Sequence, residues 1–305
     1  MTIPSYRVIG RFNRLAALVC LGAALVGLGL LHLPAAGAAG ISVTRGDDAV
    51  GTGDGCTVRE AIVNANQDNQ SGSTDCGPGS GADTLIFAGD YTITLASALP
   101  NLTSNLTIDG AGRSVTVSGN NAVRVFTIMS SAVVTLSHLS IIRGNSDIGG
   151  GIHNNGTLTV SNSTFSGNSA SPSFGGGIYN NDTLYLGNNI LANSLTGGDC
   201  VNTGTLVTNL NNLVEDGSCS PAYAGDPKLG PLYPNGGSTL TQGLLPGSPA
   251  IDAGDNAICA AAPVNNRDQR GVIRPIDGND DGLATCDLGA FEVTYLTYLP
   301  LVVKP

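Results

Sequence analysis

Positive charge, tryptophan and methionine are all scarce in this sequence. It has no tryptophan and two methionines, and its 13 Lys and Arg residues stand against 23 Asp and Glu residues, for a formal net charge of −10. Lysine occurs only at Lys228 and Lys304. Proteins that bind nucleic acids or anionic membrane surfaces use basic patches, so this composition argues against both kinds of partner. It fits an acidic exported protein or one that collects cations.

Long hydrophobic runs are also missing outside the two ends of the chain. Near the start, three arginines precede an uncharged apolar run from Leu15 to Leu33, and small residues follow it. This order is typical of a secretory signal peptide over residues 1–39, with an uncleaved membrane anchor as the alternative. We therefore expect a secreted, extracellular protein, free or attached to the cell surface, with no stable membrane span after signal cleavage.

Cysteines are few, but their number is informative. The chain has seven, and one lies inside the apolar leader. An even set of six in an exported chain favours disulfides, and six cysteines allow 15 connectivities, so the sequence alone does not fix the pairing. No CxxC pair or histidine cluster supports a zinc site. Among the connectivities we choose the pairs nearest in sequence, Cys56–Cys76, Cys200–Cys219 and Cys259–Cys286.

The chain does contain a repeat. The segment at 149–158 reads GGGIHNNGTL and the segment at 175–184 reads GGGIYNNDTL, 26 residues later. A self-similar period of this size is the signature of a stacked-repeat architecture. Weaker copies extend it in both directions: Thr205-Leu206 follows Thr183-Leu184 by 22 residues, and Thr135-Leu136 precedes Thr157-Leu158 by 22 residues.

Each copy of the repeat contains short strands. In TLTV at 157–160 and TLYL at 183–186 an apolar residue occupies every second position, which is the period of a strand with one buried face. One coil cannot bury its own apolar face, but stacked coils form a continuous core. We therefore predict an all-β fold, a single-stranded right-handed parallel β-helix over residues 83–222 that resembles the pectate-lyase-like fold. The side chains expected to point inward are Leu158, Val160, Phe165, Leu184, Leu186 and Leu206.

Asparagines recur at the ends of successive copies. The segment Arg143-Gly144-Asn145 resembles Ser166-Gly167-Asn168, and Asn193 ends the next copy. The side chains of Asn145, Asn168 and Asn193 are therefore candidates for an internal ladder in which each amide bonds the next. The alternative is that asparagine occurs at these positions because it suits turns.

One segment has a convincing helical pattern. In CTVREAIVNAN at 56–66, the apolar residues Ala61, Ile62 and Ala65 share one face. The segment resembles the Cys-Ser-Leu-Arg-Glu-Ala motif at the start of many exported bacterial β-helix proteins, with Thr57 and Val58 replacing Ser and Leu. The resemblance implies a short N-terminal capping helix, which covers the open apolar end of the stack.

We assign residues 40–82 to this N-terminal cap segment. It contains adjacent opposite charges at Arg59 and Glu60. A catalytic pair is one interpretation of these residues, but most such pairs are solvated or structural, so we interpret them as an ion pair of the cap.

Three motifs mark the C-terminal part of the chain. They are GSPAIDAG at 247–254, DQRGVIRP at 268–275 and CDLGAFE at 286–292. Together they resemble the C-terminal module of the bacterial "choice-of-anchor Q" family, whose members pair a β-helix with varied cell-surface sorting tails. We assign residues 223–292 to such a module. The resemblance implies a fold and a cell-surface location and no established chemistry.

The apolar tail, residues 293–305, is far too short to span a bilayer and has no LPxTG sortase signal. A sorting tail of another kind is one interpretation. The other is an edge strand, because a β-rich run interrupted by proline is usually an edge.

The sharpest local motif is DGNDDG at 277–282. It matches the start of an EF-type calcium loop, in which alternate side chains converge on one cation and the glycine permits the tight bend. Leu288 stands where the loop needs a bidentate Glu, and Asp287 or Glu292 is the candidate substitute. The alternative is an acidic flexible turn, and no other cofactor is expected. The predicted calcium ligands are Asp277, Asn279, Asp281 and Asp287.

The central coils contain few residues that could take part in catalysis. Polysaccharide lyases and hydrolases with this fold need carboxylates grouped on one lateral face. The outward residues of the central coils are mostly Thr, Ser, Asn and Tyr, and the four titratable candidates fall in different parts of the repeat. We predict no catalytic residues and a structural, adhesive or carbohydrate-contacting platform, with a divergent polysaccharide lyase or glycoside hydrolase as the alternative. The expected partner is a cell-wall or extracellular polysaccharide, or another surface protein. The titratable candidates are Asp147, His153, Asp182 and Asp199.

Overall fold

A computed structural model describes residues 40–220, 225–237 and 239–294. The predicted signal peptide lies outside the described residues, as does the apolar tail from residue 295 onward.

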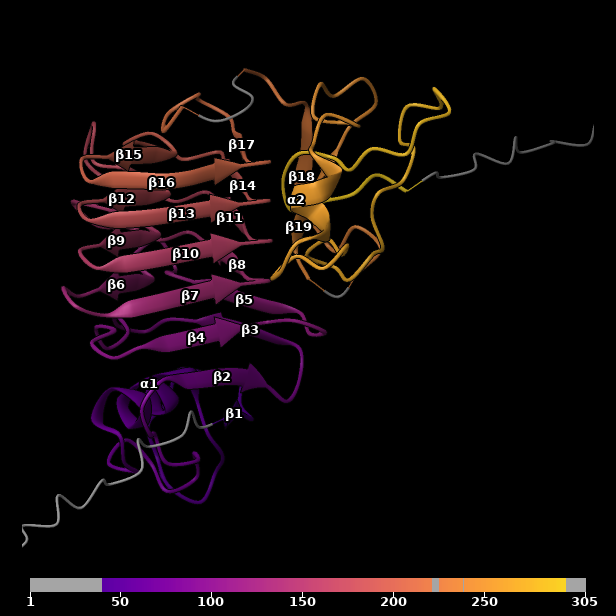
Figure 1. The fold of residues 1–305 in the computed structure, drawn as a ribbon. Helices are drawn as coiled ribbons and strands as arrows, with labels where there is room; N and C mark the ends of the chain where they lie inside the picture. Colours follow the sequence, from indigo (N-terminus) through magenta and orange to yellow (C-terminus); the bar gives the residue numbers. More distant parts are fainter. Residues whose placement is uncertain (1–39, 221–224, 238, 295–305) are drawn as a thin grey trace, which may run out of the picture. The chain divides into compact units, whose positions relative to one another are not determined.

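Three parallel sheets form the main body of the described chain, and successive strands along the sequence alternate among them. The longest, sheet A, has seven strands stacked in the order in which the chain reaches them (Figure 1). Every pair of neighbours in it is parallel. Its strands are β1 (Gly40–Val43), β2 (Asp83–Phe87), β4 (Leu106–Asp109), β7 (Val133–Ser137), β10 (Thr157–Ser161), β13 (Thr183–Gly187) and β16 (Thr205–Leu210).

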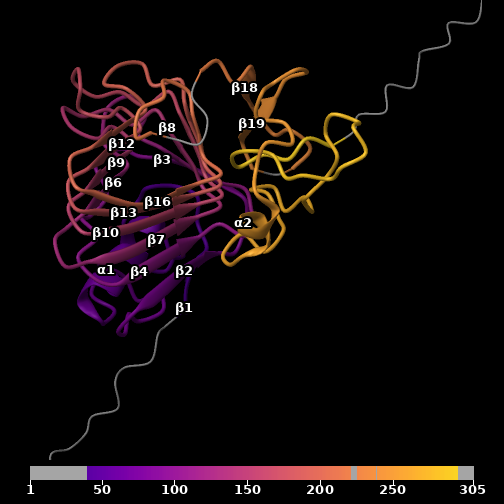
Figure 2. The same cartoon turned by 45° about the horizontal axis from the view of Figure 1, so that its top comes forward.

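Sheets B and C complete each coil. Sheet B has six parallel strands, and sheet C has four and begins only at the coil that contains β6. The view in Figure 2 shows β6, β9 and β12 of sheet C one above another, beside β10 and β13 of sheet A. The chain is therefore a parallel β-helix with three strands per coil, as predicted; its handedness stays a prediction. The strands of sheet B are β3 (Tyr91–Thr94), β5 (Val115–Ser118), β8 (Ser140–Ile142), β11 (Thr164–Ser166), β14 (Ile190–Ala192) and β17 (Leu213–Val214). Those of sheet C are β6 (Phe126–Ile128), β9 (Ile152–Asn154), β12 (Ile178–Asn180) and β15 (Cys200–Asn202).

The core is a column of apolar side chains inside the stacked coils. Leu158 lies opposite Val134 on one side and Leu184 on the other, and all three are fully buried. Five of the six side chains predicted to point inward are buried. The sixth, Leu206, packs against the core but is only partly buried, because β16 ends sheet A.

The strand register confirms the main repeat and corrects one extension of it. Leu158 pairs with Leu184 and Thr183 pairs with Thr205, as the spacings of 26 and 22 residues predict. The upstream alignment was wrong by two residues, because Leu158 pairs with Val134 and not with Leu136. A slip of two residues leaves the same side chains facing inward, so the alternating pattern does not reveal it.

The predicted asparagine ladder was wrong in its members. Asn145 pairs with Ser169, not with Asn168. The Asn168 amide turns to the backbone instead, accepting from the Gly144 N–H and donating to the Ile141 carbonyl. Asn193 adopts a left-handed backbone conformation, with φ 56°, and is exposed. The turn interpretation therefore holds for Asn193.

A ladder does exist at another position of the coil. The Asn154 Nδ2 donates to the Asn180 Oδ1 at 2.6 Å, and the Asn180 Nδ2 donates to the Asn202 Oδ1 at 2.6 Å. A second pair lies between Asn189 and Asn212, where the Asn189 Nδ2 donates to the Asn212 Oδ1 at 3.0 Å. All of these asparagines except Asn202 are fully buried, so a slip of the register would leave buried amides without partners.

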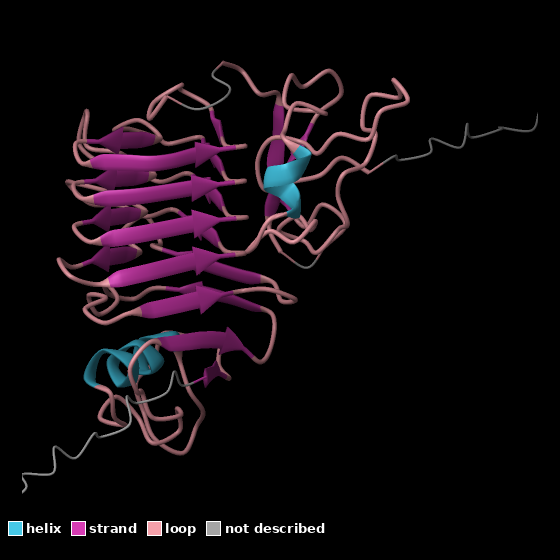
Figure 3. Cartoon of the chain, viewed as in Figure 1, coloured by secondary structure: helices cyan, strands magenta, loops and turns pink. Residues whose placement is uncertain are grey.

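The helix α1 (Val58–Gln67) begins at a capping box. The Thr57 side chain accepts from the Glu60 N–H, and the Glu60 carboxylate accepts from the Thr57 N–H at 3.0 Å. Ala61, Ile62 and Ala65 are fully buried, as predicted. The helix contacts β1 and β2 and lies at their end of the stack (Figure 3). It therefore covers the first coil, and β1, which the sequence placed in the cap segment, is the first strand of sheet A.

The predicted ion pair between Arg59 and Glu60 was wrong. Arg59 pairs with Asp48, with Nε–Oδ1 and Nη2–Oδ2 distances of 2.8 Å, and it donates to the carbonyls of Ser97 and Ala98. Glu60 is used by the capping box instead. Both residues are nevertheless structural, because each holds the cap in place.

The C-terminal module has little regular structure. Strands β18 (Leu229–Tyr233) and β19 (Thr241–Leu244) pair antiparallel, and α2 (Asn256–Ala260) is one short helix. The module contacts sheet B: the Thr164 hydroxyl lies 2.6 Å from the Gln269 Oε1, and Ile190 shares an apolar cluster with Phe291. Among the described residues, no helix is long and apolar enough to cross a membrane. All three predicted disulfides form: Cys56–Cys76, Cys200–Cys219 and Cys259–Cys286.

The stack predicts a sharp difference between inward and outward side chains of one strand. Leu184→Asp places a carboxylate in the apolar column, and we expect a loss of more than about 4 kcal/mol and no cooperative thermal melt by circular dichroism. The matched control is Tyr185→Asp, which changes the next, outward side chain and should melt cooperatively. A soluble Leu184→Asp variant that melts like the control would contradict the assignment of the core.

Candidate functional site

An open groove with a volume of about 570 Å³ lies on the flank of the β-helix, where each coil passes from sheet B to sheet C. Its walls come from the same turn of successive coils, so residues far apart in sequence lie side by side. The lining is mostly small and polar. The lining residues are Ala98, Ala122, Val123, Arg124, Asn145, Ser146, Asp147, Ser169, Ala170, Ser171 and Thr196.

Glycine allows these turns to stack closely. Asn145, Ser169 and Thr196 form successive parallel bridges, and the Gly150 N–H donates to the Gly175 carbonyl of the next coil. A Cβ atom at Gly150 would lie 2.1 Å from the Ser169 carbonyl oxygen, which no side chain permits. The repeated glycine triplet is therefore a requirement of close backbone approach behind the groove.

Arg124 is the cation of the groove. Its guanidinium donates to the Ile148 carbonyl at 2.6 Å, to the Ser146 hydroxyl at 2.8 Å and to the Thr127 hydroxyl at 3.2 Å. Desolvation by burial lowers the pKa of Arg124, and the negative charge of Asp147 opposes that shift. The groove thus holds one cation and one carboxylate near each other, and its charge is close to balanced.

Three rings lie next to the groove, and we call them the aromatic cluster: His153, Phe174 and Tyr179. His153 and Tyr179 are neighbours across sheet C, with ring centroids 5.6 Å apart in an edge-to-face arrangement. The Phe174 centroid lies 5.9 Å from that of Tyr179, and Phe174 is 39% exposed. Burial and the charge of Arg124 lower the pKa of His153, so its ring is neutral near pH 7.

The aromatic cluster connects directly to the groove. Thr127, which accepts from Arg124, pairs with His153 in sheet C. The Phe174 N–H donates to the carbonyl of Ser171, a lining residue. The partly exposed rings are therefore neighbours of the hydroxyl and amide groups that line the groove.

The structure brings together only some of the titratable candidates. Asp147 lines the groove, and His153 lies beside it, both under the influence of Arg124. Asp182 is exposed and accepts from the Thr183 hydroxyl at 3.1 Å. Among the lining residues within the described chain, Asp147 is the only carboxylate.

Asp199 lies deeper, in the last full coil, where it exchanges hydrogen bonds with Asp216. The Asp199 N–H donates to the Asp216 Oδ2 at 2.9 Å, and the Asp216 N–H donates to the Asp199 Oδ2 at 3.2 Å. Desolvation by burial, with the nearby Asp216 charge, raises the pKa of Asp199 to about 6. Because Asp199 is only 2% exposed and both its oxygens accept backbone N–H groups, it serves the fold of this coil.

The side-chain oxygens of the predicted calcium ligands accept hydrogen bonds from backbone N–H groups. Both carboxylate oxygens of Asp277 accept N–H groups of its own loop, and the Asn279 Oδ1 accepts from the Asp281 N–H. Asp287 is buried and accepts from the N–H groups of Asp252 and Val293 instead. No cluster of three or more acidic, histidine or cysteine side chains fit to hold a metal occurs in the described ranges. The calcium site therefore stays a prediction, with the acidic turn as its alternative.

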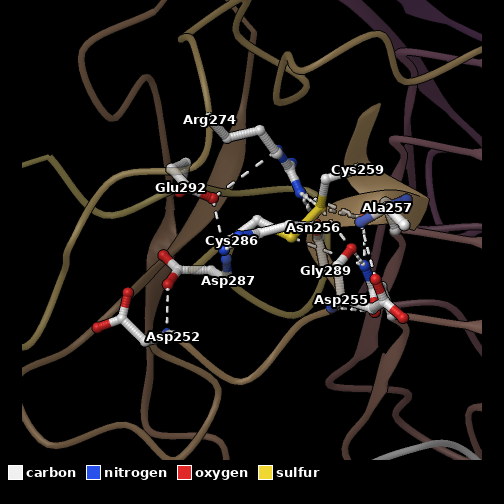
Figure 4. Close-up of a disulfide and its surroundings, with 12 residues drawn as sticks. Asp252, Asp255, Asn256, Ala257, Cys259, Arg274, Cys286, Asp287, Gly289 and Glu292 are labelled. Carbon is white, nitrogen blue, oxygen red and sulfur yellow. Dashed lines mark hydrogen bonds and ion pairs between the residues drawn. A yellow bond between two sulfur atoms is a disulfide. The ribbon is translucent and has the colours of Figure 1, made fainter. Parts of the chain in front are cut away.

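Asp287 belongs to a buried polar network that joins the motifs of the C-terminal module (Figure 4). The Asp287 N–H donates to the Glu292 Oε2 at 3.0 Å, and the Arg274 Nε lies 3.8 Å from the same oxygen. Burial raises the pKa of Asp287 to about 6 and that of Glu292 to about 7. Arg274 also donates to the Cys259 Sγ, so this network surrounds the disulfide Cys259–Cys286.

Sequence reasoning missed Arg124, Phe174 and Tyr179 as site residues. For Tyr179 a signal existed, since His153 and Tyr179 occupy the same position in the two clearest copies of the repeat. Arg124 and Phe174 gave no signal, because they reach the site from irregular turns.

Searches against protein-family models, curated proteins and solved structures each found no match to this chain. The two resemblances described above therefore stay predictions.

The raised pKa of Asp199 makes a pH-dependent prediction. Below a pH of about 4 this group is protonated in the folded and the unfolded chain, whereas above about 6 the folded chain carries an unfavourable buried charge. Asp199→Asn should therefore gain stability relative to the wild type as the pH rises from 4 to 8, by at most about 3 kcal/mol. Thermal melts at both pH values measure this difference.

The control for that measurement is Asp182→Asn, which removes the same charge from an exposed position. Its melting temperature relative to the wild type should not depend on pH. A constant difference between Asp199→Asn and the wild type at pH 4 and pH 8 would show that Asp199 is not destabilised by its burial.

Proposed function

We propose that this protein is an exported, cell-surface or extracellular contact platform that binds an uncharged polysaccharide in its lateral groove and does not catalyse a reaction. The observation that carries the proposal is the position of the aromatic cluster next to the groove. Sugars offer hydroxyl groups at their edges and C–H groups on their faces. Serine, asparagine and threonine side chains complement the first, and aromatic rings complement the second.

The charge distribution supports an uncharged ligand. Arg124 uses its donors on carbonyl and hydroxyl groups of the protein, and Asp147 lies near it. The chain as a whole is strongly acidic. Acidic polysaccharides would therefore be repelled at low ionic strength, without an uncompensated cation in the groove to attract them.

The chemistry of the groove supports binding without turnover. Glycoside hydrolases place two carboxylates on either side of the scissile bond, and only Asp147 is available among the lining residues described. The carboxyl with the raised pKa, Asp199, is buried and held by backbone N–H groups. The alternative, a divergent polysaccharide lyase or hydrolase, needs groups that the groove does not offer.

Two features of the chain support export to the cell surface or the extracellular space. The apolar leader has the features of a signal peptide, and three disulfides are typical of chains that fold in an oxidising compartment. The resemblance of the C-terminal motifs to an anchor-type module supports attachment to a cell surface.

The groove predicts a specific effect of one aromatic residue. Tyr179→Ala removes the central ring of the aromatic cluster, and retention by a neutral soluble glucan, hydroxyethylcellulose, should weaken at least tenfold in affinity gel electrophoresis. The control Tyr233→Ala removes a tyrosine that is 64% exposed on β18 and should bind like the wild type.

Two results of the same experiment would reject the proposal. One is equal retention of the wild type and Tyr179→Ala in the neutral glucan, or retention of neither. The other is release of reducing ends or unsaturated products, from hydroxyethylcellulose or from polygalacturonate, with or without calcium, which would establish an enzyme.

A further inference from the structure

The outward face of sheet A carries a column of five threonines and one tyrosine that the groove does not use. Each member pairs in register with the next, from one coil to the following one. All six are partly exposed. The column consists of Thr84, Thr107, Thr135, Thr159, Tyr185 and Thr208.

A second column runs beside the first. Its members pair in register and are Thr157, Thr183 and Thr205. On the first two strands the member lies two residues before the central column. On the last strand it lies three residues before, because the register shifts there at a bulge. Neighbouring strands lie about 4.8 Å apart, so the central column offers one side chain per step over roughly 24 Å. This regularity follows from the same stacking that builds the core.

The chemistry of the two columns is uniform, and the carboxylate of Asp109, elsewhere on this face, is bonded to Ser137 and His138. Both columns are without charged residues in the described strands of sheet A. Apart from the Thr183 hydroxyl, which donates to Asp182, no threonine hydroxyl of the two columns has a hydrogen-bond partner within the described residues. Threonine is β-branched and stiff at χ1, so each position holds a methyl and a hydroxyl in a fixed arrangement. The face also exposes Val133, which is 50% exposed.

The outward faces of the other two parallel sheets differ from this one. The module contacts the outside of sheet B, where the Ser140 hydroxyl donates to the Leu240 carbonyl and Thr164 meets Gln269. Sheet C carries the aromatic cluster. Sheet A is therefore the remaining sheet with an open, regular outward face.

We propose that this face binds one extended, uncharged polysaccharide chain of β-linked pyranose units, lying along the axis of the β-helix. The step between coils is close to the length of one sugar in such a chain, so successive threonines meet successive sugars. The free hydroxyls bond sugar hydroxyls, the methyl groups contact C–H faces, and Tyr185 offers a ring for stacking. A coiled α-linked glucan does not keep this repeat, and an acidic glycan is repelled by the chain.

This surface is separate from the groove and shares with the proposed function only the class of partner. Its test is adsorption of the exported chain to microcrystalline cellulose, measured by depletion, with granular starch as the α-linked comparison. The wild type should adsorb to cellulose and at least tenfold less to starch. The double variant Thr135→Glu/Thr159→Glu should lower the partition coefficient on cellulose at least tenfold, because it places two hydrated carboxylates in the column.

Two further variants keep the outcome clear. Thr92→Glu changes an exposed threonine on β3 of sheet B and should adsorb like the wild type. Tyr185→Ser removes the ring without adding charge and should also weaken adsorption. It replaces the double variant as the test if circular dichroism shows that the double variant does not fold. Tyr179→Ala, which tests the groove, should leave adsorption to cellulose unchanged.

Three results would overturn the inference: no adsorption of the wild type, equal adsorption to cellulose and starch, or unchanged adsorption of folded Thr135→Glu/Thr159→Glu and Tyr185→Ser. Loss of adsorption in Tyr179→Ala alone would assign binding to the groove and also reject a role for sheet A. Adsorption of the wild type to cellulose without any retention of the wild type by hydroxyethylcellulose would reject the groove and keep sheet A.

Discussion

In-register stacking of parallel coils is the constraint on which the rest of this structure depends. Each apolar side chain of a coil packs against the equivalent side chains above and below, as Leu158 does between Val134 and Leu184. No coil is stable alone, because its apolar face has no other partner. The amide ladder through Asn154, Asn180 and Asn202 favours a single register of the coils, because any other register would leave a buried amide without its hydrogen bonds.

The stacking also determines the surface. A side chain that points outward in one coil lies beside its equivalent in the next coil. Equivalent positions of successive coils therefore form columns and grooves on the surface. The same register places Asn145, Ser169 and Thr196 along one groove, and Thr135 beside Thr159 on the outside of sheet A. Binding surfaces with a fixed repeat are therefore a direct product of the core.

The fold was predictable because its signal is repeated. The period of 26 residues, the alternation in its strands and the apolar face of the helical segment at 56–66 each identified an element that the structure contains. The disulfides followed from nearness in sequence, and all three formed. The register between β7 and β10 was predicted wrongly, because a shift of two residues leaves the pattern of buried side chains unchanged.

The candidate site was much less predictable. Arg124 and Phe174 come from irregular turns, whose position is set by the stack and not by a local pattern. At Asp277 a local pattern is present, but its carboxylate accepts N–H groups of its own loop, and the calcium site stays a prediction. The asparagine ladder was assigned to the wrong residues, because ladder and turn asparagines look alike in sequence. Only the strand register distinguishes Asn180, which lies in the ladder, from Asn193, which lies in a turn.

The most direct test of the parallel stack is solution NMR of the exported chain with selectively labelled leucine and valine methyl groups. The account predicts nuclear Overhauser effects from the Leu158 methyl groups to those of both Val134 and Leu184, with no other leucine or valine of sheet A in between. Contacts of Leu158 to only one of these neighbours, or the cross-strand pattern of antiparallel pairing, would contradict it.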